Sequence, residues 1–157
     1  MPRRDDIEWV LVLGSGPIRI GQAAEFDFSG SQAIQALRED GYKVILVNSN
    51  PATIQNDPEM ADIVYIEPLL SSTVEQILRK EKPDAILAGM GGQTALNIAS
   101  DLAHRGVLDE LGVELIGSDL EAIDKAEDRE LFNQVCESIN LPISKAIACH
   151  NMNEVLL

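Results

Sequence analysis

The hydrophobic positions of this chain fall into short continuous runs separated by longer amphipathic stretches. Five runs have the length and the Val, Ile and Leu content of strands that are buried on both faces, at residues 10–13, 43–47, 63–66, 84–88 and 113–117. The stretches between them carry helical periodicity, for example Ala33, Ile34 and Leu37 on one face. This alternation predicts an α/β fold with a doubly wound, mainly parallel sheet.

The pattern changes after the fifth run. Polar helical sequence extends from about residue 119 to 140, with an apolar side of Leu131, Val135 and Ile139. Residues 143–149 are typical of one more strand, and a further helix begins at Asn151 and is cut off at Leu157. We therefore expect an α/β domain at residues 1–117 and a helical linker at residues 118–157.

Two serines precede glutamates at the spacing of a capping box. The pairs are Ser72 with Glu75 and Ser118 with Glu121. In this motif the serine side chain accepts a hydrogen bond from the third backbone N–H of the helix, and the glutamate bonds back to the serine N–H. Both pairs therefore predict the start of a helix.

Two glycine-rich turns follow the first and the fourth predicted strands. In a doubly wound sheet, ligands bind beyond the carboxyl ends of the strands, where both turns lie. The first turn, residues 14–21, lacks the third glycine of a dinucleotide fingerprint, and Asn48 stands where a ribose-binding acid is expected. The second turn, residues 91–94, is either an anion cradle of backbone N–H groups or a plain turn capped by Thr94.

Charge and composition narrow the classes of partner. The chain has 12 basic and 26 acidic residues and a net charge of −14, which argues against nucleic acid and an anionic membrane surface. An acidic face that meets a basic partner is the alternative to a merely well-solvated surface. No apolar run reaches membrane-spanning length, and Cys136 and Cys149 lack disulfide or metal spacing, so we expect a cytoplasmic protein with reduced thiols.

Several longer sequence motifs are more specific than the glycine-rich turns and resemble those of a known protein family. Residues 14–30, GSGPIRIGQAAEFDFSG, resemble the opening loop of carbamoyl-phosphate synthetase large chains. Further segments are similar to other signatures of that family, in order and without obvious gaps, at residues 47–54, 57–62, 65–68, 90–97 and 122–129. The resemblance implies a Rossmann-like pre-ATP-grasp domain of the carboxyphosphate half, followed by linker helices and the truncated start of an ATP-grasp domain.

The resemblance also implies an activity for the parent enzyme. Such an ATP-dependent ligase makes carbamoyl phosphate from bicarbonate, glutamine-derived ammonia and two ATP, for arginine and pyrimidine synthesis. The implied partners are the remainder of the large chain and a glutaminase small subunit. ATP and Mg²⁺ (or Mn²⁺) are the implied cofactors, with the metal ligands outside this chain. We expect the present piece to lack catalytic residues and to be inactive alone; the alternative is a stand-alone nucleotide-binding Rossmann-like module.

Five residues acquire candidate roles from the resemblance. Arg129 matches an arginine that binds ATP phosphate in the carboxyphosphate site, a task that suits a guanidinium; without the resemblance it is a solvated helix arginine among acidic neighbours. Glu130 departs from the basic residue that some relatives carry there. The first loop matches the region beside the internal tunnel for carbamate, whose lining must exclude bulk water. Its candidate residues are Ile18, Ile20, Ala23 and Glu25.

Overall fold

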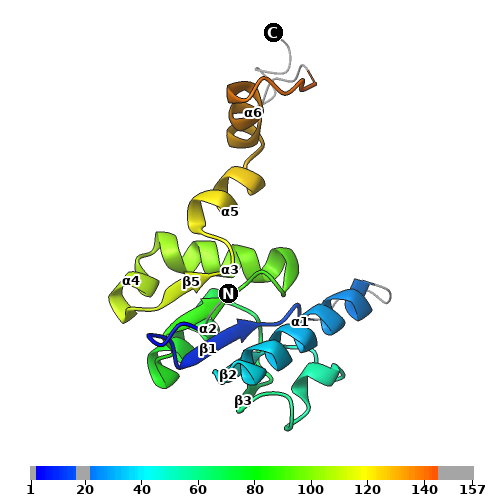
Figure 1. Cartoon of the computed structure of the whole chain (residues 1–157), viewed down its shortest axis with the longest axis vertical. Coiled ribbons are helices and arrows are strands. Elements are labelled where there is room, and N and C mark those ends of the chain that lie inside the picture. The colour runs from blue at the N-terminus through cyan, green and yellow to red at the C-terminus, as the bar shows by residue number, and fades with distance from the viewer. Residues whose placement is uncertain (1–2, 17–21, 145–157) are drawn as a thin grey trace. The chain divides into compact units, whose positions relative to one another are not determined.

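The computed structural model describes residues 3–16 and 22–144 of the 157-residue chain (Figure 1). These residues form a parallel five-stranded sheet with the order β3-β2-β1-β4-β5. The strands are β1 (Trp9–Leu13), β2 (Lys43–Val47), β3 (Ile63–Tyr65), β4 (Ala85–Leu87) and β5 (Glu114–Ile116). The predicted α/β fold is therefore confirmed, and the five strands predicted between residues 10 and 117 are present within a few residues of their expected bounds.

Helices cover both faces of the sheet. Helix α1 (Gln22–Glu39) packs on one face, and α2 (Ser71–Glu81), α3 (Gly92–His104) and α4 (Val107–Leu111) pack on the other. The described residues also form a 3₁₀ turn η1 (Ile54–Asn56) and two further helices, α5 (Leu120–Glu127) and α6 (Arg129–Ser138). Alternate residues of β1 point to opposite faces, as the pleat requires. Leu11 and Leu13 join a core cluster with α2, α3 and α4, whereas Val10 and Val12 join a second cluster with Ile34 of α1.

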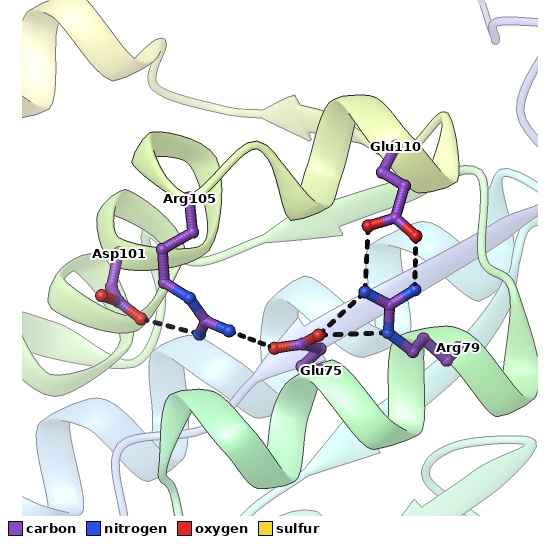
Figure 2. Close-up of polar contacts among 5 residues, drawn as sticks. All are labelled: Glu75, Arg79, Asp101, Arg105 and Glu110. Atoms are coloured by element: carbon purple, nitrogen blue, oxygen red, sulfur yellow. Dashed lines mark hydrogen bonds and ion pairs between the residues drawn. The ribbon is translucent and has the colours of Figure 1, made fainter.

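The capping-box prediction for α2 is wrong. The helix begins at Ser71 after Leu70, and Leu70 supplies no side-chain cap. The Glu75 carboxylate, which the motif would send back to Ser72, instead accepts hydrogen bonds from Arg79 and Arg105 (Figure 2). Charge-assisted bonds to guanidinium groups are stronger than a bond to a neutral backbone N–H, and they decide where this carboxylate lies.

The predicted continuous helix from about residue 119 to 140 is two helices, α5 and α6. Asp128 separates them, since its side chain accepts hydrogen bonds from the backbone N–H groups of Glu130 (2.8 Å) and Leu131 (2.9 Å). An aspartate that caps a helix in this way competes with the backbone bonds of the preceding helix. The predicted apolar side is also wrong in part, because Leu131 and Ile139 are exposed and Cys136 is buried.

The chain divides into two compact units, residues 1–120 and 121–157, which are described separately below. The first unit contains the sheet, and α6 lies in the second. The predicted helix from Asn151 and most of the predicted strand at residues 143–149 lie outside the described residues. Within the described ranges, no helix combines the length and the apolar character that crossing a bilayer requires.

Candidate functional site

A pocket of about 510 Å³ opens at the carboxyl edge of the sheet. Segments that follow β1, β2 and β3, together with the first turn of α3, contribute its walls. We call it the carboxyl-edge pocket, and its lining residues are Ser15, Gly16, Ser49, Ile66, Glu67, Pro68, Leu69 and Thr94. Its position is the one at which open parallel sheets bind ligands, because the loops after neighbouring strands converge there.

In the described part of the first glycine-rich turn, residues 14–16, side chains occupy the space beside both glycines. The N–H of Gly14 donates to the carbonyl of Val47 (2.8 Å), and a Cβ on Gly14 would lie 2.4 Å from Asn48 Nδ2. Gly16 has a φ of +71°, and a Cβ there would lie 3.0 Å from Ser49 Oγ. Close packing and a left-handed backbone therefore account for these glycines.

Behind this turn lies a pair of fully buried amides. The Asn48 Nδ2 donates to Gln55 Oε1 (3.1 Å), and the Gln55 Nε2 donates to the carbonyl of Phe26 in α1 (3.1 Å). Asn48 Oδ1 accepts from the N–H of Asn50 (3.0 Å). Both polar atoms of the Asn48 side chain therefore bond to groups within the domain, and neither is left to bind a ribose hydroxyl. This arrangement argues against a dinucleotide site. Gln55 was not predicted as a buried residue, because its position in a polar loop carries no signal of burial.

The second glycine-rich turn packs directly on the first. A Cβ on Gly91 would lie 2.6 Å from the carbonyl oxygens of both Leu13 and Gly14. The predicted Thr94 cap is wrong: Gly91 occupies the cap position of α3, and Thr94 lies in the first helical turn, exposed to the pocket. An anion cradle gains no support here, because Glu67 is the charged residue among the described lining residues.

Arg129 is exposed at the first position of α6, directly after the Asp128 cap. It lines a separate pocket of about 370 Å³ together with Ala126, Phe132, Asn133, Ile143 and Ser144. Its guanidinium makes no ion pair with a described residue, although three acidic residues are its neighbours in sequence. A free guanidinium beside the N-terminal, positive end of a helix is suited to an anion such as phosphate.

The structure describes few of the tunnel candidates. Ile18 and Ile20 lie outside the described residues, and Ala23 belongs to α1 but its side chain is not described. Glu25 is exposed in the first turn of α1. Among the described residues no cluster of His, Cys, Asp or Glu has the composition of a metal site.

A parallel sheet with helices on both faces and a pocket at its carboxyl edge defines a Rossmann-like α/β domain. Solved structures share this fold. The biotin carboxylase domain of a single-chain bacterial carboxylase aligns with a TM-score of 0.65 and 15% identity, over 94% of this chain and 32% of that one. The biotin carboxylase domain of Hydrogenobacter thermophilus 2-oxoglutarate carboxylase, solved with MgADP and bicarbonate, aligns with a TM-score of 0.61 and 18% identity, over 88% and 29%.

Sequence comparison identifies the family within this fold. Residues 6–125 match the family described as carbamoyl phosphate synthase preATP-grasp domain, and the chain belongs to that family. It is 63% identical over 156 residues to the carbamoyl phosphate synthase large chain of Neisseria meningitidis serogroup A, covering 99% of this chain and 15% of the relative. The large chain of Archaeoglobus fulgidus is 61% identical over 99% of this chain and 14% of its own length. The chain thus spans about 15% of these relatives.

Proposed function

We propose that this chain is the first part of a glutamine-dependent carbamoyl-phosphate synthetase large chain. The parent ligase makes carbamoyl phosphate from bicarbonate, glutamine-derived ammonia and two ATP, and feeds arginine and pyrimidine synthesis in the cytoplasm. The observation that carries this proposal is the identity of about 60% to such large chains over almost every residue of the chain. The bound MgADP and bicarbonate of the Hydrogenobacter domain are in keeping with the ligands proposed here.

The proposal assigns residues 1–117 to the pre-ATP-grasp domain and residues 118–157 to the linker and the start of the ATP-grasp domain. Arg129 holds a phosphate of ATP in the carboxyphosphate site, and its guanidinium, exposed and without an ion pair to any described residue, supports that role. Ile18, Ile20, Ala23 and Glu25 line the path of carbamate. The ligands of Mg²⁺ (or Mn²⁺) are part of the same proposal and come from the remainder of the large chain. A glutaminase small subunit supplies ammonia.

Substitution of Arg129 in the full-length parent enzyme tests this proposal. Arg129→Ala should reduce bicarbonate-dependent ATP hydrolysis by about 10-fold or more, the effect of losing one charge-assisted contact of about 1.5 kcal/mol or more. Carbamoyl-phosphate-dependent ATP synthesis, the partial reaction of the second half, should be unchanged. Lys125→Ala removes an exposed cation of α5 that pairs with Glu121 and serves as the matched control.

The isolated 157-residue chain is the second control. It should hydrolyse no ATP in the presence of bicarbonate, since the proposal places the remaining nucleotide and metal ligands outside it. Equal loss of both partial reactions in Arg129→Ala would contradict the assignment of the arginine. Turnover of bicarbonate and ATP by the isolated chain would contradict the proposed division of the site.

A further inference from the structure

The carboxyl-edge pocket contains polar side chains whose hydrogen-bonding capacity the described residues leave unused. Ser15 is only 6% exposed, and its Oγ has no hydrogen-bond partner. The hydroxyls of Ser49 and Thr94 and the carboxylate of Glu67 also make no side-chain bond within the described residues. They come from four separate segments of the chain. Their convergence is therefore a property of the fold and not of one local sequence.

The buried hydroxyl of Ser15 is the strongest indication of a missing partner. A buried polar group without a hydrogen bond costs about 1–3 kcal/mol, and folded proteins rarely leave one unpaired. Neighbouring groups hold Ser15 in place, because Gly14 packs on Asn48 and Gly16 lies against Ser49 and Leu69. This packing keeps the Ser15 side chain buried, away from water. A group that enters the pocket can supply the partner.

The lining of the pocket defines the chemistry of that group. Glu67 gives the pocket negative charge, and hydroxyls can accept hydrogen bonds, so the entering group should be a cationic N–H donor. The apolar walls, Ile66, Pro68 and Leu69, suit the methylene stem of a lysine or arginine. The net charge of −14 also favours a positively charged group over a negatively charged one as the occupant of the pocket.

We propose that a lysine or arginine side chain from the remainder of the large chain, beyond residue 157, inserts into the carboxyl-edge pocket and pairs with Glu67. This inference rests on the proposed function, since it requires the parent protein. The relatives offer ample chain for it, because the present residues cover only about 15% of their length. Ile66 is 53% and Leu70 57% exposed beside the pocket, and they would be covered by the same contact.

A cysteine reporter at Thr94 tests this docking. Thr94→Cys is prepared in the full-length parent and in the 157-residue chain, each is treated with iodoacetamide, and the modified peptide is quantified by mass spectrometry. The cysteine should react at least about 10-fold more slowly in the parent, because only the rarely populated undocked state exposes it. Peptide-level detection separates this thiol from the native Cys136 and Cys149.

Charge reversal then tests the chemistry of the occupant. Adding Glu67→Lys should restore fast labelling in the parent and leave the rate in the 157-residue chain unchanged. Glu59→Lys is the matched control, because Glu59 is an exposed carboxylate between β2 and β3 that does not line the pocket, and it should change neither rate.

Three results would overturn the proposal. Fast labelling of the parent would show an open pocket, and protection that persists in Glu67→Lys would show an occupant that is not basic. Protection within the 157-residue chain itself would place the occupant inside residues 1–157. The assay of carbamoyl phosphate formation by the wild-type parent is independent of labelling, so a failure of the proposed function is recognised separately.

Discussion

At the scale of single residues, two buried amides dictate where this chain must have glycine. A Cβ on Gly14 would lie 2.4 Å from Asn48 Nδ2, and a Cβ on Gly30 would lie 2.4 Å from Gln55 Nε2. Both amides are fully buried and are bonded to each other. Because neighbouring atoms enclose them, neither side chain can withdraw to make room for a methyl group.

Gly30→Ala therefore should destabilise the chain, although alanine normally stabilises the interior of a helix by about 0.5–1 kcal/mol relative to glycine. We expect a loss of about 1–3 kcal/mol from overpacking, measured by urea unfolding followed by circular dichroism. Gln55→Ala should cost about 1–3 kcal/mol by leaving buried partners unpaired. The double variant should lose less than the sum, because the shortened residue 55 leaves space for the new methyl group.

Gln76→Ala, on the exposed side of α2, is the control and should be nearly neutral. A stabilised Gly30→Ala variant, or strict additivity with Gln55→Ala, would contradict the packing argument. The sequence predicted the tight turn at Gly14 and the absence of a ribose ligand at Asn48. It did not predict the contact with Gln55, because that contact depends on the η1 turn bringing residue 55 beneath α1.

At the scale of elements, an ion-pair network connects three helices on one face of the sheet. Glu75 of α2 pairs with Arg79 (2.9 Å) and with Arg105, which follows α3. Arg79 continues the network to Glu110 of α4 (2.8 Å), as Figure 2 shows. Each exposed pair alone contributes little, but a shared carboxylate that joins two arginines fixes the helices relative to one another.

The contribution of Glu75 should depend on pH in a defined direction. Hydrogen bonds from Arg79 and Arg105 lower the pKa of the Glu75 carboxyl. A lowered pKa in the folded state means that the stabilisation is complete above the unfolded pKa of about 4.3 and is lost as pH falls through the folded value. Glu75→Gln should therefore lower the thermal midpoint at pH 7, and the difference from wild type should shrink below about pH 4.3.

Glu59→Gln is the matched control, since this exposed carboxylate makes no ion pair with the described residues, and its midpoint should follow wild type at both pH values. A Glu75→Gln difference that grows on acidification would contradict the argument. Strand positions followed from hydrophobic runs because burial in a parallel sheet needs continuous apolar sequence. The cap of α2 and the break between α5 and α6 did not, because Glu75 and Asp128 each have competing hydrogen-bond partners that the local sequence does not rank.

For the molecule as a whole, the sequence predicted the family correctly, and the comparisons confirm that prediction. Long motifs such as residues 14–30 are specific, whereas the glycine spacing within them suits several kinds of site. The carboxyl-edge pocket needed the fold, since its residues lie as far apart in sequence as Ser15 and Thr94. The four polar groups that lack a side-chain bond within the described residues can be recognised only once the fold has brought these loops together.

The net charge of −14 makes a prediction for the isolated chain as a whole. Salt weakens the exposed ion pairs, which destabilises the fold, but it also screens repulsion among the excess carboxylates, which stabilises it. Because exposed pairs contribute little and acidic residues outnumber basic ones 26 to 12, we expect relief of repulsion to dominate. The thermal midpoint should rise as NaCl increases from about 0.01 M to 0.1 M, where the Debye length falls from about 30 to 10 Å.

The double variant Glu59→Lys and Glu67→Lys carries less excess negative charge and should show a smaller rise of the midpoint. A midpoint that falls with salt would mean that the ion pairs of α2, α3 and α4 outweigh the repulsion across the surface.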